Sequence, residues 1–102
     1  MTYTVHRMDL PITDRFDASI PGYVKPLHVA ESRNIPGYLE LWYEVETDDQ
    51  ARHNITITVH GTGNPIGHRT GPGSSEFLGT VVARNGLVWH VYVGRTETMA
   101  PR

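Results

Sequence analysis

Hydrophobic and polar residues alternate with a period of two along much of this chain. Residues 38–47 show the alternation most clearly, and residues 54–60 repeat it with many β-branched side chains. A two-residue repeat is typical of a strand that buries one face, and β-branched residues suit a pleated sheet. The positions predicted to face inward are Leu39, Leu41, Tyr43, Val45, Ile55, Ile57 and Val59. These two segments are the clearest predicted strands.

Residues 87–93 are apolar or aromatic on both alternating faces, which predicts a central strand that is covered on both sides. One face carries Leu87, Trp89, Val91 and Val93, and the other carries Val88, His90 and Tyr92. The preceding Asn85-Gly86 pair predicts a type I′ turn, whose two central residues both need positive φ. We therefore expect residues 77–83 to pair with 87–93 as a hairpin.

Three weaker strands are predicted at residues 3–10, 16–20 and 24–31. Pro21-Gly22 separates the second from the third, Pro36-Gly37 separates the third from the strand at 38–47, and such pairs favour turns. Pro26 lies inside the third of these segments. Because proline has no amide hydrogen for a sheet ladder, this strand is expected at an edge or a bulge.

These segments predict an all-β fold, a compact antiparallel β-sandwich or barrel-like sheet of about 6–8 short strands. The chain has 102 residues, of which 38% are hydrophobic and 20% charged, a size and composition that fit one core. We expect residues 1–95 to form a single β domain and residues 96–102 to form a flexible C-terminal tail.

Composition excludes several classes of protein. No apolar run is long enough for a membrane span or a signal-peptide core, so a soluble, intracellular protein is expected. The chain has no cysteine, which removes disulfides and thiol nucleophiles. A formal net charge of -2 argues against a protein that binds DNA or RNA duplexes through overall positive charge.

Charge is unevenly distributed along the chain. Residues 40–49 contain five carboxylates and no Lys or Arg, whereas residues 51–75 contain no acidic residue. The second window carries Arg52, His53, His60, His68 and Arg69. It is either an anion-attracting stretch or one of two neighbouring strands whose acids and bases pair with each other.

Residues 61–75 hold five of the ten glycines and follow the predicted strand at 54–60. Glycine lets main-chain amides approach an anion, and consecutive amides in a turn can form a concave phosphate-binding nest. The segment matches neither the Walker spacing nor the dinucleotide fingerprint. A plain long connector is the alternative, although long loops in compact domains are often functional.

Six histidines raise the question of a metal site. No two of them have the spacing that places two ligands on one face of a strand, although His60 and His90 could converge from neighbouring strands. No nucleophile elbow and no isolated carboxylate pair is present either. We therefore expect no metal, no cofactor and no catalytic residue. Because a short open sheet leaves exposed edges, a homo-oligomer is expected, with Trp42 and Tyr92 either as interface anchors or as rings that close the sandwich.

Several motifs together resemble a widespread family of small phage and prophage proteins that is catalogued as a domain of unknown function. The resemblance spans nearly the whole chain, and its most specific parts are the GTG-x-Pro segment and the closing Trp-His-Val-Tyr strand. The matching segments are Leu10-Pro11-Ile12-Thr13-Asp14, Ile20-Pro21, His60-Gly61-Thr62-Gly63-Asn64-Pro65, Phe77-Leu78-Gly79-Thr80 and Val88-Trp89-His90-Val91-Tyr92. Family members usually carry an aromatic residue at the position of His60 and histidine at the position of Asn64, which puts roles specific to those side chains in doubt.

The resemblance implies a phage accessory protein of the host cytoplasm that sequesters a small anionic ligand. Such sponges capture cyclic oligonucleotide signals of host defence systems such as CBASS or Thoeris, and inhibit that defence without degrading the signal. The expected partners are this ligand and further copies of the chain in a dimer or tetramer, with no nucleic-acid duplex and no membrane. The expected ligand-binding residues are His60, Gly61, Thr62, Gly63, Asn64, Pro65, His68, Arg69, Trp89, His90 and Tyr92. The alternatives are a module that binds a host or virion protein and a small cyclic-nucleotide hydrolase.

Overall fold

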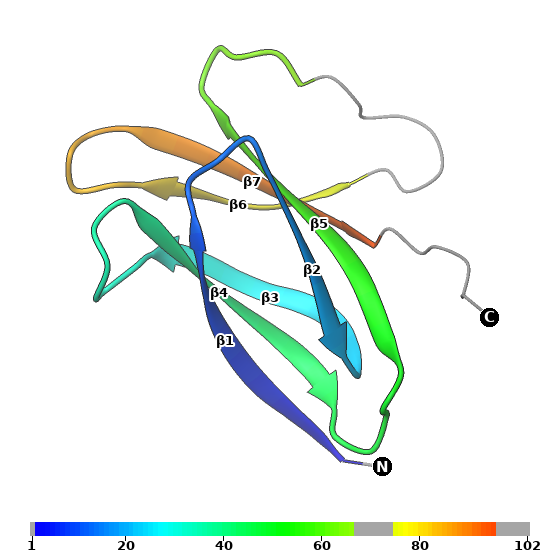
Figure 1. Ribbon diagram of the computed structural model, residues 1–102. Coiled ribbons are helices and arrows are strands. Elements are labelled where there is room, and N and C mark those ends of the chain that lie inside the picture. The colour runs from blue at the N-terminus through cyan, green and yellow to red at the C-terminus, as the bar shows by residue number, and fades with distance from the viewer. Residues whose placement is uncertain (1, 67–74, 96–102) are drawn as a thin grey trace.

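The computed structural model describes residues 2–66 and 75–95, and within these ranges the chain is all-β, without a helix. All seven predicted strands are present, and each begins and ends within two residues of its predicted bounds. The strands are β1 (Tyr3–Pro11), β2 (Arg15–Pro21), β3 (Tyr23–Glu31), β4 (Tyr38–Glu46), β5 (Arg52–Gly61), β6 (Glu76–Val82) and β7 (Val88–Arg95) (Figure 1). The predicted tail at 96–102 lies outside the described residues.

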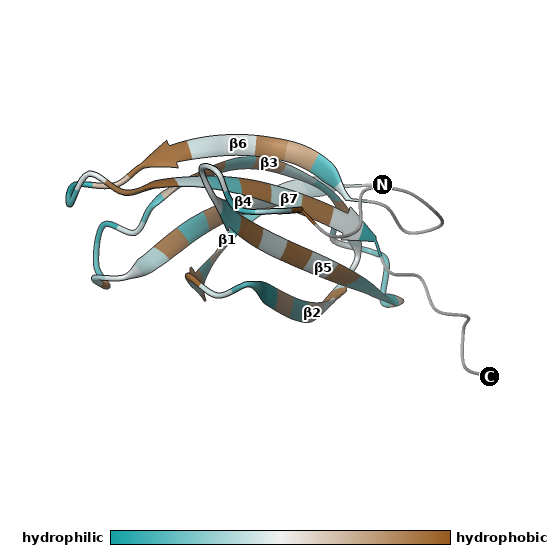
Figure 2. Cartoon of the chain, turned by 90° about the horizontal axis from the view of Figure 1, so that it is seen from above, coloured by the Kyte–Doolittle hydropathy of each residue, from teal (hydrophilic) through white to brown (hydrophobic). Residues whose placement is uncertain are grey.

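The strands form two antiparallel sheets. The three-stranded sheet has the order β1-β4-β3, and the four-stranded sheet has the order β2-β5-β7-β6. The edge strands β3 and β6 lie against each other, as the view in Figure 2 also shows. There a Cβ atom added to Gly79 of β6 would lie 3.3 Å from Cγ1 of Val29. Pro26 lies on an edge strand between two register shifts, as predicted.

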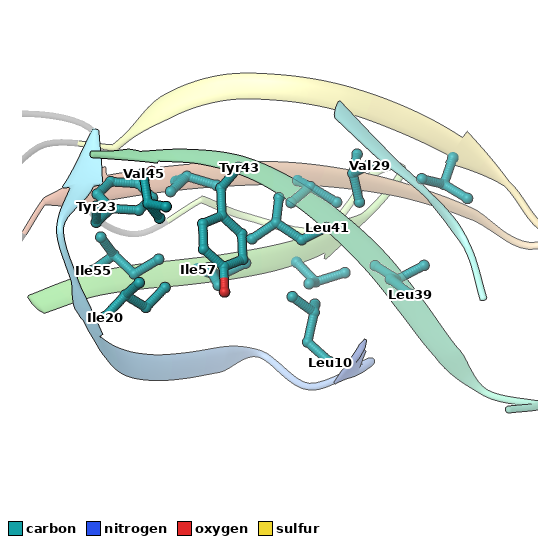
Figure 3. Packing of buried hydrophobic residues seen from close by; sticks show 14 residues of the cluster. Leu10, Ile20, Tyr23, Val29, Leu39, Leu41, Tyr43, Val45, Ile55 and Ile57 are labelled. Carbon is teal, nitrogen blue, oxygen red and sulfur yellow. The ribbon is translucent and has the colours of Figure 1, made fainter. Parts of the chain in front are cut away.

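The core lies between the two sheets and is built from alternate residues of their facing strands (Figure 3). Its fully buried members are Leu10, Leu39, Leu41, Ile55, Ile57 and Val91. Burial of a side chain of this size contributes about 1.5–3 kcal/mol. The inward positions that the alternation predicts for β4 and β5 are therefore confirmed.

Trp42 and Tyr92 lie on the outer faces of the sheets. Each is half-buried and alternates along its strand with residues of the core. Trp42 packs against His28, with 5.7 Å between the ring centroids. The interpretation that these two rings close the sandwich is therefore wrong, because the alternation that buries their neighbours turns them outward.

The β6–β7 hairpin forms as predicted, but its turn differs. Gly86 has a φ of 90°, while no residue other than glycine has positive φ in the described part of the chain. The amide of Gly86 donates to the carbonyl of Ala83 (2.9 Å), and the amide of Ala83 donates to the carbonyl of Leu87 (2.9 Å). This is a type I turn followed by a left-handed glycine, a three-residue loop. The predicted type I′ turn is wrong because Asn85 keeps negative φ.

The acidic run on β4 is partly neutralised by arginines from neighbouring segments. The carboxylate of Glu40 is buried and accepts hydrogen bonds from the backbone amide (2.7 Å) and Nε (3.2 Å) of Arg33, while Nη1 of Arg7 lies 3.7 Å away. The backbone hydrogen bond from Arg33 is the main cause that lowers the pKa of Glu40 below its ordinary value. Asp49 pairs instead with His53, at 3.1 Å. Only His53 among these partners comes from the basic window at 51–75.

Acid is expected to destabilise the fold in part through Glu40. Because its pKa is lowered in the folded state, it contributes stability that is present above its unfolded pKa of about 4.3 and is lost as pH falls through the folded pKa. Glu40→Gln removes this charge. Urea denaturation should show the variant less stable than the wild type at neutral pH, with the gap narrowing below about pH 4. A gap that stays constant across this range would contradict the assignment.

Candidate functional site

Residues 61–64 form a tight turn directly after β5. The amide of Asn64 donates to the carbonyl of Gly61 (3.0 Å), and Gly63 has a φ of 91°. Positive φ at the third residue defines a type II turn and favours glycine there. The amides of Thr62 and Gly63 donate to no described residue, and both residues are exposed. Of these three turn amides, only that of Asn64 has an acceptor in the described part of the chain, and this acceptor lies within the turn.

A line of side chains crosses the outer face of the four-stranded sheet. Sheet register places Arg15 of β2, Thr58 of β5, Tyr92 of β7 and Phe77 of β6 opposite one another in sequence. The ring of Tyr92 meets those of Phe77 and His60 edge to face, each at 5.5 Å between centroids. We call Phe77, Tyr92 and His60 the ring platform. Phe77 is 55% exposed, so solvent reaches the platform.

His90 connects the turn to the platform. It lies opposite His60 and Thr80, and its Nε2 is 2.7 Å from Oγ1 of Thr62 while its Nδ1 is 3.0 Å from Oγ1 of Thr80. A neutral imidazole donates through one nitrogen and accepts through the other, and a hydroxyl can take either role. His90 therefore holds Thr62, and with it the start of the turn, against the sheet.

A cavity of about 340 Å³ lies between the turn and β2. Its lining residues are Asp14, Arg15, Thr58, Val59, His60, Asn64 and Pro65. Nε2 of His60 is buried and has no hydrogen-bond partner among the residues that the structure describes. An unpaired buried nitrogen costs free energy that a ligand with a polar group can recover.

The charge around this cavity differs from the expectation. Residues 51–75 contain no acid, but the fold brings Asp14 to the same cavity as Arg15. Arg15 also bonds Asp17 (3.1 Å between Nε and Oδ1), and this hydrogen bond is the main cause that lowers the pKa of Asp17. Arg15, the one arginine among the described residues that line this cavity, is thus accompanied by carboxylates.

The structure divides the predicted ligand-binding residues between two faces of the sheet. His60, Thr62, His90 and the other outward residues gather on the outer side, whereas Trp89 packs against the core. A Cβ atom added to Gly61 would lie 3.6 Å from Cζ3 of Trp89. Trp89 lines an open hollow of about 490 Å³ together with three predicted ligand-binding residues of the turn, Gly61, Thr62 and Asn64. Trp89 therefore lies on the opposite face of β7 from His90 and Tyr92, next to the turn at residues 61–64.

Some residues of the site were not predicted from the sequence, and some predicted residues lie outside the described ranges. The sequence did not predict four residues of the site, Arg15, Thr58, Phe77 and Thr80. The predicted β6–β7 hairpin could have indicated Phe77 and Thr80, because it places their strand beside His90 and Tyr92. The predicted ligand residues His68 and Arg69 lie outside the described residues. Among residues 2–66 and 75–95, no group of three or more His, Asp or Glu side chains is arranged to hold a metal ion.

Comparison with known proteins gives one match. A family model described as "Domain of unknown function (DUF7352)" matches residues 1–101. No curated protein and no solved structure matches the chain. The family description states no ligand, partner or activity. In the described ranges, no helix is long and apolar enough to cross a membrane.

Proposed function

Because this chain belongs to the DUF7352 family of domains of unknown function, we propose a function from the site itself: the protein binds a nucleotide-like ligand and holds it unchanged. The observation that carries the proposal is the position of the ring platform beside exposed turn amides and a guanidinium. Nucleotides offer flat bases that stack on aromatic rings and phosphates that accept hydrogen bonds from amides and arginine.

The arrangement accounts for both parts of such a ligand. A base stacks on Phe77 or Tyr92, and the line of partners across the sheet leads from these rings to Arg15. The amides of Thr62 and Gly63 supply further phosphate donors at the end of β5. His90 serves as a positioning residue, since both of its ring nitrogens are engaged by threonine hydroxyls.

The more specific proposal is a cyclic oligonucleotide ligand. Such a molecule alternates bases and phosphates, as the site alternates rings and donors. The resemblance to small phage proteins supports a phage accessory protein that sequesters a host defence signal of the CBASS type in the host cytoplasm, as a homo-oligomer. A host or virion protein as the target, and hydrolysis of the signal, are the competing proposals.

Isothermal titration tests the proposal. The panel consists of cyclic dinucleotides and cyclic trinucleotides, with linear dinucleotides for comparison. We expect binding heat for at least one cyclic member, and chromatography should recover that compound intact after heat denaturation of the complex. Absence of heat and of any thermal shift across the panel would overturn ligand binding. Recovery of a linear product would instead support the hydrolase.

Gly63→Val is expected to weaken this binding at least about tenfold, which corresponds to 1.4 kcal/mol. A β-branched residue at a φ of 91° is strained, so the turn that presents the amides of Thr62 and Gly63 must shift. Titration with the best ligand of the panel measures the loss.

Gly37→Val is the matched control. Gly37 also has positive φ (81°), and at either position an added Cβ meets no atom of a described residue within 4 Å. Both variants should therefore lose similar stability, about 1–2 kcal/mol by urea denaturation. Equal affinities in the two variants would show that the turn at residues 61–64 is only a connector.

A further inference from the structure

The four strands at the edges of the two sheets are protected to different degrees. β3 and β6 lie against each other, and the amide of Arg84 donates to the carboxylate of Glu31 across this side (3.1 Å). β2 is shorter, ends in Pro21 and carries exposed charges. Proline and charge both discourage strand pairing at an edge.

Along its first five residues β1 has no proline, and Arg7 is the one Lys, Arg, Asp or Glu among them. The strand has nine residues, the first five of which are exposed, and no described strand pairs with its outer edge. Tyr3 and Val5 are 50% and 53% exposed. Its only proline is the last residue of the strand. An exposed edge of this length is a template for another strand.

Backbone geometry determines which residues of β1 present hydrogen-bonding groups at this edge. The amide of Thr47 donates to the carbonyl of Thr2 (2.8 Å), so Thr2 directs its backbone toward the β4 side. Backbone groups alternate in direction along an antiparallel strand. The amides and carbonyls of Val5 and Arg7 therefore point away from β4, toward the outer edge.

We propose that β1 pairs antiparallel with β1 of a second copy of this chain, about a twofold axis at Val5. In this register Val5 faces the partner's Val5, and both exchange backbone hydrogen bonds. Arg7 lies opposite the partner's Tyr3, whose exposed ring can pack against the guanidinium. The pairing joins the two three-stranded sheets into one continuous sheet with an isologous interface.

Charge selects this register over its neighbours. An axis at Arg7 places two guanidiniums opposite each other, and an axis at His6 leaves Arg7 opposite the partner's valine. With the axis at Val5, side chains of the two copies form one continuous row across the outer face of the joined sheet. Trp42 lies opposite Arg7 within one copy, and Tyr3 lies opposite Glu46 within the other. Within its own chain Arg7 donates to the carboxylate of Asp9 (2.7 Å), and in the dimer its side chain stands between two aromatic rings.

The dimer does not depend on the proposed ligand, because β1 contributes no residue to the ring platform or the turn. Sedimentation velocity of the full chain without ligand tests it. We expect a dimer for the wild type and loss of the dimer in Val5→Glu, which opposes two carboxylates at the axis. Val82→Glu is the matched control, since Val82 is 69% exposed on a different edge strand, and it should remain dimeric.

Complementary charges at Val5 provide a second test, which measures recovery of the dimer as well as its loss. Val5→Glu and Val5→Lys should each sediment as monomers with the β-sheet circular dichroism of the wild type, and an equal mixture should regain the dimer. A wild type that sediments as a monomer would overturn the proposal, as would a dimer that persists in Val5→Glu. If β1 instead pairs with a strand of another protein, the wild type alone should sediment as a monomer.

Discussion

Tyr92→Ala is expected to weaken nucleotide binding by about 10- to 100-fold. Stacking of a base on an aromatic side chain contributes about 1–3 kcal/mol. Tyr92 is the middle ring of the platform, with Phe77 on one side and His60 on the other, each at 5.5 Å. Its loss removes one stacking surface and also frees the two neighbouring rings to move. Titration with the best cyclic ligand of the panel measures the change.

Two variants separate stacking from a general effect on the fold. Tyr92→Phe keeps the ring and is expected to bind close to the wild type. Trp42→Ala removes a half-buried ring that also packs against a histidine, but from the outer face of the other sheet. It should lose stability and keep its affinity. Wild-type affinity in Tyr92→Ala, or an equal loss in Trp42→Ala, would contradict the platform as the binding surface.

The strands could be predicted because each buries one face. Alternation in residues 38–47 and 54–60 is a local property of the sequence, and it reports directly which side chains reach the core. The same alternation already separated Trp89 from His90 and Tyr92. Grouping all three as ligand residues followed the motif rather than the face, and the structure divides them accordingly.

The site could not be predicted because it is assembled across strands. Arg15 and Tyr92 lie in one row because both are paired with Thr58 of β5, and no local sequence pattern predicts that β2 pairs with β5. The β6–β7 hairpin shows how strongly the register of two strands depends on the length of the loop between them. A two-residue turn at 85–86 would have set Thr80 one position away from His90, whereas the three-residue loop places them opposite each other.

Charge patterning along the sequence does not determine the charge of the cavity, for the same reason. A window free of acid along the sequence predicts a positive surface only if nothing acidic folds beside it. Asp14 follows β1 by a few residues, yet it lines the cavity with His60 and Asn64. The local potential is therefore determined by the sheet order, which composition does not contain.

Gly22→Ala is expected to destabilise the protein by about 3 kcal/mol or more and to lower Tm by about 15 °C. Gly22 is the single residue between β2 and β3, where the chain passes from one sheet to the other, and its φ is 70°. Its amide donates to the carbonyl of Ala51 (2.9 Å), and its carbonyl accepts from the amide of Glu46 (2.8 Å). An added Cβ would lie 2.4 Å from the carbonyl oxygen of Glu46. Because that atom belongs to the backbone, no side-chain rotation relieves the clash.

Gly37→Ala isolates the steric part of this loss. Gly37 has a similar φ of 81°, but an added Cβ there meets no atom within 4 Å. It should therefore show only the cost of a left-handed conformation, about 1–2 kcal/mol. Thermal and urea denaturation of the two variants give the difference directly. Equal losses would mean that the β2–β3 connection moves away from Glu46 at little cost, and that the two sheets are not held together by close contact at Gly22.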